Sequence, residues 1–239
     1  MSALGRNRLA LIVVAAVAIA GASAAALILT GGSDSPDDTE PGDRTGPFVS
    51  VGDLPGDGWT SADTALQQAS TSGVELASSA PSFPECESLR VLERALAGAD
   101  GSFVAGETRT AERRDGDRLV ASLTHTRLEF SDATALQAAI TEMDAAVAAP
   151  DFALCLERAA ATSGLQAAVA PSEPAAAPPA GGSAHAFTYT VAAGDGAERM
   201  VQHLYWWPEQ TTLVTLVIAT WDGEQDVPGM LDSAVGAAQ

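Results

Sequence analysis

The sequence predicts an α+β domain, in which helices pack on an antiparallel sheet, preceded by one N-terminal transmembrane helix. Three observations predict this architecture. An uncharged apolar run follows a basic start, later segments repeat apolar residues at helical spacing, and alternating apolar and polar segments are joined by very short turns. Short turns join antiparallel neighbours, and the helices are then available to cover the sheet.

The first predicted element is a transmembrane helix over residues 9–30, which contain no charged side chain. As a helix this run would be about 33 Å long, enough to span the hydrocarbon core of a bilayer. Arg6 and Arg8 precede the run. The positive-inside rule therefore places residues 1–8 in the cytoplasm and the chain after the run outside.

A cleaved signal peptide is the alternative interpretation of the same run. Ala22-Ser23-Ala24 fits the small-residue pattern of a processing site, and cleavage there would release a secreted protein. Hydrophobicity resumes after this site and continues through Leu29, which a mature N-terminus does not need. We therefore favour the retained anchor, which makes the chain a single-pass protein of the cell membrane.

Two regions rich in Pro and Gly organise the rest of the chain. Residues 31–47 are predicted to be an acidic tether, because they contain hardly any apolar side chain to bury. Residues 48–239 follow as one extracytoplasmic domain, long enough to bury about 70% of its unfolded surface. The tract over residues 170–183 is interpreted as an internal loop, since the segment after it is too short to cover a sheet of its own.

Three helices are predicted in this domain. The first begins at Pro84, the second at an N-cap formed by Ser131, and the third after Pro228. Pro150 interrupts the second helix, and a new helical turn follows it. The apolar positions that define these helices are Leu89, Leu92, Leu96, Leu136, Ile140, Met143, Val147, Phe152, Leu156, Ala159, Met230, Leu231, Ala234 and Val235.

Three turn signals predict the strands. The turns are Asp115-Gly116, Gly194-Asp195-Gly196 and Pro208-Glu209-Gln210. They separate strands expected over residues 106–114, 117–130, 186–191, 198–207 and 211–221. The last strand is apolar on both faces, with Val214, Leu216 and Ile218 on one and Leu213, Val217 and Trp221 on the other. It is therefore predicted to be central in the sheet and covered on both sides.

The charge of the chain excludes one class of partner. Its 12 basic side chains are all arginine and face 31 Asp and Glu, which gives a formal net charge of −19. A surface this negative repels phosphate backbones, so nucleic-acid binding is excluded. The apolar share of 46% is ordinary for a folded protein and excludes global disorder.

Cys86 and Cys155 are the only cysteines of the chain. A disulfide is expected between them, because they lie in a segment predicted to be outside the cytoplasm. The bridge would join the start of the first helix to the turn after Pro150. A redox or metal-binding thiol pair is disfavoured, since the spacing is far from C-x-x-C and no histidine lies at metal-motif distance.

Motifs for catalysis are missing from the sequence. It contains no nucleophile elbow, zinc-protease, phosphate-loop, dinucleotide or EF-hand pattern. His125, His185 and His203 are far apart and each is expected on a strand, where a structural histidine is commoner than a ligand or a base. No catalytic residue, metal ligand or cofactor is therefore predicted.

The aromatic run Tyr205-Trp206-Trp207 holds the candidate ligand-binding residues. Alternation places Trp207 with Tyr205 and His203 on one face, and Trp206 on the other. One face has to be core; an uncovered second face would offer a ligand an apolar wall with a polar edge. Core packing of both tryptophans is the favoured interpretation, and the ligand wall is the alternative. Trp59 is a further candidate, although a tryptophan entering a first strand usually closes a core.

Five short motifs, each present once, lie along the domain. They are Asp53-Leu54-Pro55-Gly56-Asp57-Gly58-Trp59, Pro84-Glu85-Cys86 at a helix start, Leu128-Glu129-Phe130 at a hairpin end, the helix over residues 131–140, and Cys155. Together they resemble the extracytoplasmic sensor-domain family of actinobacteria, which includes the outer domain of certain receptor serine/threonine kinases and related anchored proteins and lipoproteins. The likeness covers about residues 48–239. It implies a ligand cleft outside the membrane, although the second disulfide of the kinase ectodomain is absent here.

Three hypotheses for function follow. The first is a non-enzymatic, membrane-anchored, sensor-like domain that binds a small molecule, a lipid or an envelope protein. The second is a structural or accessory subunit of a cell-envelope complex, docking through a sheet edge or the acidic surface. The third is a hydrolase of unrecognised type. An apolar pocket above about 300 Å³ would favour the first, and a flat apolar patch the second.

Overall fold

The computed structural model describes residues 48–61, 85–97, 102–162, 165–193, 196–221 and 225–237. The predicted anchor and tether, Pro84 and the predicted turn at Gly194-Asp195 lie outside these residues. Within the described part of the chain, no helix has the length and apolar character needed to cross a bilayer.

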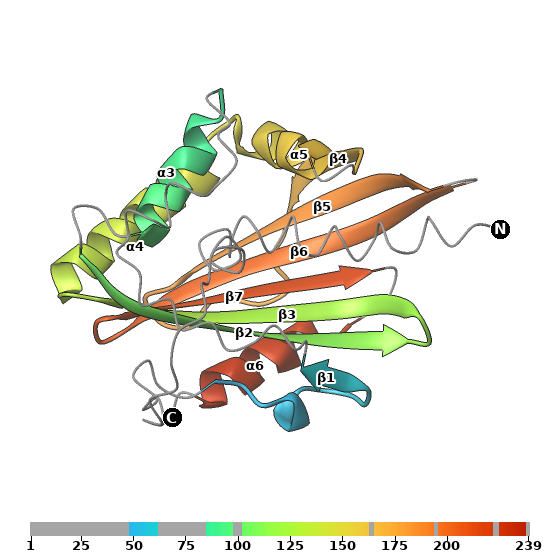
Figure 1. The fold of residues 1–239 in the computed structure, drawn as a ribbon, viewed down its shortest axis with the longest axis horizontal. Coiled ribbons are helices and arrows are strands. Elements are labelled where there is room, and N and C mark those ends of the chain that lie inside the picture. The colour runs from blue at the N-terminus through green and yellow to red at the C-terminus, as the bar shows by residue number, and fades with distance from the viewer. Residues whose placement is uncertain are drawn as a thin grey trace, which may run out of the picture.

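In the described part of the chain, seven strands form one antiparallel sheet in the order β1-β2-β3-β7-β6-β5-β4 (Figure 1). An antiparallel sheet is what the sequence predicts. The strands are β1 (Trp59–Ser61), β2 (Phe103–Asp115), β3 (Arg118–Phe130), β4 (Ala167–Ser172), β5 (Ser183–Ala193), β6 (Gly196–Glu209) and β7 (Thr212–Trp221). Every neighbouring pair is antiparallel. The sheet therefore has β1 and β4 at its two edges.

The central strand β7 separates two hydrophobic cores, which confirms its predicted position. Leu213, Val217 and Trp221 belong to the first core, and Val214, Leu216 and Ile218 to the second. Because side chains alternate along a strand, one apolar run supplies both faces. Loss of either covering layer would expose half of this strand to water.

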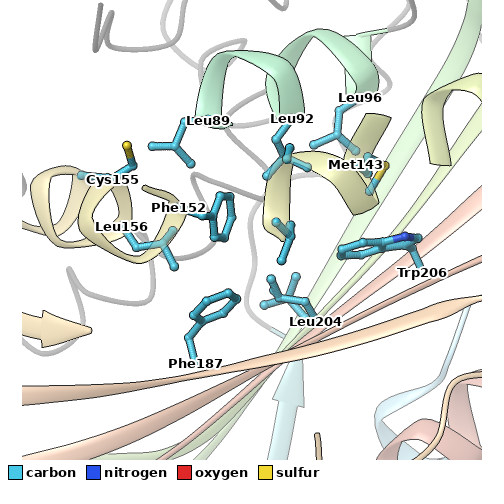
Figure 2. Close-up of a cluster of buried hydrophobic side chains, with 14 of the residues drawn as sticks. Leu89, Leu92, Leu96, Met143, Phe152, Cys155, Leu156, Phe187, Leu204 and Trp206 are labelled. Atoms are coloured by element: carbon cyan, nitrogen blue, oxygen red, sulfur yellow. The ribbon is translucent and has the colours of Figure 1, made fainter. Parts of the chain in front are cut away.

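Helices cover the two faces unequally (Figure 1). The helices α3 (Glu87–Ala97), α4 (Ala133–Val147) and α5 (Phe152–Thr162) lie on the first face, and α6 (Val227–Ala237) lies on the second. A short 3-10 helix, η2 (Val51–Asp53), lies near the entrance of β1. Figure 2 shows how Leu92 and Leu96 of α3 and Phe152 of α5 point toward Leu204 and Phe187 of the sheet. The predicted apolar helix faces are confirmed.

Two local predictions were wrong by one residue each. The N-cap of α4 is Asp132, not Ser131, because an Asp132 carboxylate oxygen accepts hydrogen bonds from the Thr134 and Ala135 N–H groups. The first hairpin turns at Gly116 and Asp117, one residue later than predicted. Gly116 adopts φ +58°, which suits the first central position of a two-residue hairpin.

Two Pro-containing segments that were predicted as a turn and a loop lie partly in strands. Pro208 pairs with Leu213 inside β6–β7, and Gln210 (φ +57°) occupies the turn instead. In the predicted loop over residues 170–183, the first three residues complete β4. Proline is tolerated in β4 because this strand is an edge, where one side of the backbone has no ladder partner.

The β4 edge is protected against pairing with another strand. The Val169 N–H donates to Oε1 of Glu157 on α5 at 2.8 Å, so this amide is already occupied. Two residues further along the same edge, Pro171 has no N–H to donate. These features disfavour docking of a second protein by strand addition along β4.

Candidate functional site

A groove of about 720 Å³ opens on the second face of the sheet. Its floor is formed by Val201 and His203 of β6 and Thr220 of β7. One wall comes from the end of β4 and the residues after it, and the other from the N-terminal end of α6, including Asp226. The volume lies within the range of about 300–1,000 Å³ that is typical of small-molecule pockets.

A cavity on the first face is much smaller. An apolar cavity between α3, α4, α5 and the sheet measures about 30 Å³, which is room for a single water molecule. Large exposed apolar side chains of the described residues are Val51, Val104 and Leu154, and they lie on different elements. This cavity is therefore far smaller than a ligand pocket, and the three exposed apolar side chains do not share one element.

The segment of residues 173–182, called the strap below, connects β4 to β5 across the second face. Near its start, the Ala175 N–H donates to Nδ1 of His203 at 3.4 Å, and the Ala176 N–H donates to the Tyr205 hydroxyl at 3.3 Å. At its end, a Cβ on Gly182 would lie 2.5 Å from the Trp206 carbonyl oxygen, so only glycine fits there. The strap thus lies directly on β6.

His203 is the polar centre of the groove floor and is only 5% exposed. Burial lowers its pKa to about 4, so the ring is neutral at pH 7. Because Nδ1 accepts the Ala175 N–H, the proton of the neutral ring lies on Nε2. Among the described residues nothing accepts a hydrogen bond from Nε2, and the buried Oγ of Ser172, also in the lining, has no partner either.

The rim of the groove carries charges of both signs. Glu173 of the strap and Asp226 before α6 are exposed, and Arg199 of β6 lies between the two walls. One Asp226 oxygen accepts the Gly229 N–H at 2.9 Å, which caps α6 and fixes this carboxylate at the rim. Two carboxylates against one guanidinium leave the groove slightly negative, in line with the charge of the whole chain.

The predicted residues Trp207, Tyr205 and His203 share the second face of β6, as alternation indicates. Only His203 lines the groove; Tyr205 and Trp207 are buried in the second core beneath α6 and the strap. Their rings do not form an open wall. Trp206 is buried in the first core, where its Nε1 donates to Asp144 at 3.2 Å. A ligand role for these residues stays a prediction.

Trp59 is in the same core but away from the groove. It lies on β1, four strands from β6, which corresponds to about 19 Å at ordinary strand spacing. Its Nε1 donates to the Pro55 carbonyl at 3.0 Å, which closes the turn that leads into β1. Trp59 therefore lies too far from His203 to line the same groove.

The other two histidines, His125 and His185, pack against aromatic rings. His125 is fully buried on β3, accepts the Val49 N–H at 3.4 Å and packs against the Phe48 ring. Burial, with the nearby Arg127 and Arg109 charges, lowers its pKa to about 3. His185 stacks on Trp206 and faces Asp144; burial lowers its pKa, and Asp144 opposes this shift.

We expect the free energy of unfolding to fall as the pH is lowered from 7 to 5.5. The pKa values of His125 and His203 lie below the ordinary 6.5 in the folded chain, so the unfolded chain binds more protons in this range. Their stabilising contribution is complete above pH 6.5 and is lost below it, by at most about 1.4 kcal/mol per pH unit for each ring. Urea unfolding at several pH values measures this slope; a constant stability would contradict it.

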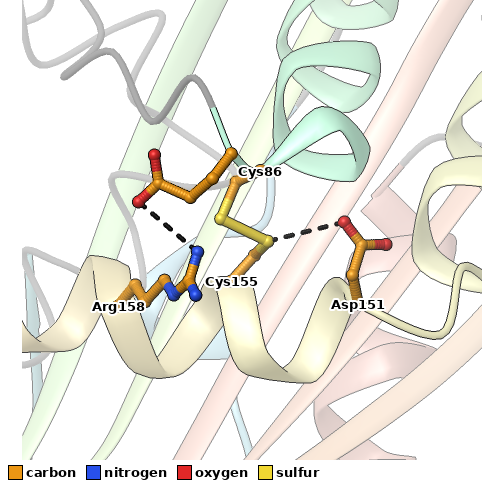
Figure 3. Close-up of a disulfide and its surroundings, with 5 residues drawn as sticks. Cys86, Asp151, Cys155 and Arg158 are labelled. Carbon is orange, nitrogen blue, oxygen red and sulfur yellow. Dashed lines mark hydrogen bonds and ion pairs between the residues drawn. A yellow bond between two sulfur atoms is a disulfide. The ribbon is translucent and has the colours of Figure 1, made fainter.

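Cys86 and Cys155 form the predicted disulfide, with 5.6 Å between their Cα atoms (Figure 3). It joins the residue before α3 to the first turn of α5, and both residues are buried. Beside it, Arg158 and Glu85 form an ion pair at 3.4 Å between the same two segments. The bridge is consistent with an oxidising compartment outside the cytoplasm.

The fold and the groove together define a class: an α+β domain with one large antiparallel sheet, helices on both faces, and a polar groove on the less covered face. No family model matches the chain, and no curated protein does.

Among solved structures, the chain is similar to the extracellular domain of PknH from Mycobacterium tuberculosis. The TM-score is 0.46 at 10% identity, over 79% of this chain and 96% of that chain. It is also similar to LpqN of the same organism, a protein involved in cell envelope biogenesis. Here the TM-score is 0.26 at 13% identity, over 83% of this chain and 84% of that one. Both are actinobacterial envelope proteins, the group that the sequence motifs resemble.

Sequence reasoning did not identify most of the groove. Ser172 and Glu173 lie in a tract that was predicted to be a loop without any motif. Thr220 and Arg199 lie in predicted strands, where nothing in the pattern distinguishes them from their neighbours. Asp226 could have been predicted as a helix N-cap, because it stands just before Val-Pro at a helix start. The groove as a whole depends on bringing four separate segments together.

Proposed function

We propose that this chain is a membrane-anchored, extracytoplasmic binding domain without catalytic activity, and that its ligand occupies the groove over His203. The observation that supports this proposal most is the almost buried His203 ring, whose Nε2–H is available in the floor of a groove of ligand size. A hydrogen-bond donor held in this way orients a bound group at little entropic cost. The uncharged run over residues 9–30 supports the anchor, and the disulfide supports the location.

The charges favour a neutral or cationic ligand, a small molecule or the polar group of a lipid. The chain carries a net charge of −19, and Glu173 and Asp226 add negative potential at the groove rim. An anionic ligand would have to approach against this field. A hydroxyl or carbonyl oxygen, in contrast, could accept the His203 Nε2–H without a net charge.

A tryptophan at position 175 should block binding. Ala175 is exposed on the strap and lines the groove, so Ala175→Trp places an indole in the ligand space with little effect on the core. Ala177→Trp is the matched control, because Ala177 is equally exposed on the strap and is not part of the groove lining. The measurement is native mass spectrometry of the full-length chain purified from its own host, compared with the denatured mass.

We expect a discrete additional mass on the wild type and on Ala177→Trp, and its loss, or at least a tenfold lower occupancy, on Ala175→Trp. An adduct that is unaffected by Ala175→Trp would place the ligand elsewhere. A bare mass on the wild type would contradict tight binding of a small molecule or lipid, and would favour a protein partner in the cell envelope.

A further inference from the structure

We propose that the strap is a pH-sensitive latch: protonation of His203 releases the first half of the strap from β6 and widens the groove. The inference concerns the position of the strap, and it holds whether or not the groove binds a ligand. It rests on how few hydrogen bonds hold the strap, and on which atoms accept them.

The strap is attached to the sheet very differently at its two ends. It contains Pro174, Pro178 and Pro179, which have no N–H to donate. Among the described residues, the only acceptors for its first half are the side chains of His203 and Tyr205 on β6. The second half is closed by the Gly182 N–H, which donates to the Pro179 carbonyl at 2.9 Å, and by the tight fit of Gly182 against β6.

Protonation converts the acceptor that holds Ala175 into a donor. In the neutral ring, the Nδ1 lone pair accepts the Ala175 N–H. When a proton from solvent binds Nδ1, two N–H groups face each other and the hydrogen bond is lost. The same proton places a positive charge on a ring that the strap helps to cover, and hydrating that charge requires the strap to move away.

Charged groups of both signs line the groove around His203. Glu173 of the strap and Asp226 before α6 favour the protonated ring, and Arg199 on β6 opposes it. The Tyr205 ring, stacked 6.4 Å away, is uncharged in the acidic range. Burial is the cause of the lowered pKa of His203, so uncovering the ring should return it toward the ordinary value.

The size of the effect follows from this linkage. With a pKa of about 4 under the closed strap and about 6.5 in water, opening becomes about 20-fold more favourable between pH 7 and 5, and about 100-fold between pH 7 and 4. Ala175 and Ala176 are adjacent in the half of the strap that moves, so their two amides should loosen together, while Gly182 stays protected.

Amide hydrogen exchange of the full-length chain tests the latch at the two amides concerned. After correction for the intrinsic pH dependence of exchange, we expect protection of the Ala175 and Ala176 amides to fall about 20-fold from pH 7 to 5, with Gly182 as the internal reference. His203→Asn keeps an acceptor that does not titrate, so protection should become independent of pH. Tyr205→Phe removes only the second acceptor; it should weaken protection at all pH values and keep the pH dependence.

Constant protection of Ala175 in the wild type, or a pH dependence that persists in His203→Asn, would overturn the latch. A second measurement does not depend on how well that variant folds. The ring ¹⁵N shifts of His203 in the wild type should show the Nε2–H tautomer at pH 7 and protonation well below pH 6. An Nδ1–H tautomer at pH 7 would equally overturn the proposal.

Discussion

Cys86→Ser is expected to lower the free energy of unfolding by about 4 kcal/mol. The bridge closes a loop with a sequence separation of 69, and in the chain-entropy model the loss of unfolded-state freedom for a loop of this length amounts to about 4 kcal/mol. The thiol sites are fully buried, so the serine hydroxyl also enters an apolar environment. Denaturant unfolding of the wild type and the variant measures the difference.

Cys155→Ser should have the same effect, and the double replacement should cost no more than either single one, because both residues make one bond. Leu154→Ser is the matched control: it introduces the same residue at the exposed neighbouring position of α5 and should change stability by about 0.5 kcal/mol or less. Losses that add up in the double variant would contradict a single shared bridge.

Glu209→Ala is expected to destabilise the domain by about 3 kcal/mol. One Glu209 oxygen pairs with the Arg127 guanidinium at 2.6 Å, and the other accepts the Trp207 Nε1–H at 2.8 Å. The Arg127 side chain is only 5% exposed, so little of its charge is hydrated. Removing the carboxylate therefore takes a charged partner away from a buried cation, which costs more than the loss of a surface ion pair.

Two further variants separate the contributions at this site. Glu209→Gln keeps an acceptor for Trp207 and removes the charge, so most of the loss should remain. Glu85→Ala breaks the exposed pair with Arg158 and should cost less than about 1 kcal/mol. Thermal or urea unfolding compares all three; a loss for Glu209→Ala no larger than that for Glu85→Ala would show that the buried pair contributes little.

The strands and helices were predictable because they depend on local periodicity. The two-sided pattern of β7 specified a central strand, and the same alternation separated Trp206 from Trp207 correctly. Errors occurred where neighbouring residues compete for one structural role. Ser131 and Asp132 can both cap a helix, and Pro208 was assigned to a turn although it lies in β6.

The groove was not predictable in the same way. His203 was selected as a candidate from its place in an aromatic strand, but nothing in the local pattern showed that it would lie under Ala175, 28 positions earlier in the chain. The face beside Trp207, considered as an alternative ligand wall, is covered by α6 and the strap. Covering a sheet face depends on elements distant in sequence, and no local period reports them.

The sequence by itself thus determined the alternation of the strands, the apolar faces of the helices and the cysteines available for a bridge, because each depends on the pattern of adjacent residues. Only the tertiary structure decided that the Pro-rich segment after β4 lies over β6, that Glu209 reaches Arg127, and that His203 opens into a groove. These outcomes depend on which of several apolar surfaces pack together, and that choice is made by the shape and burial of the whole domain.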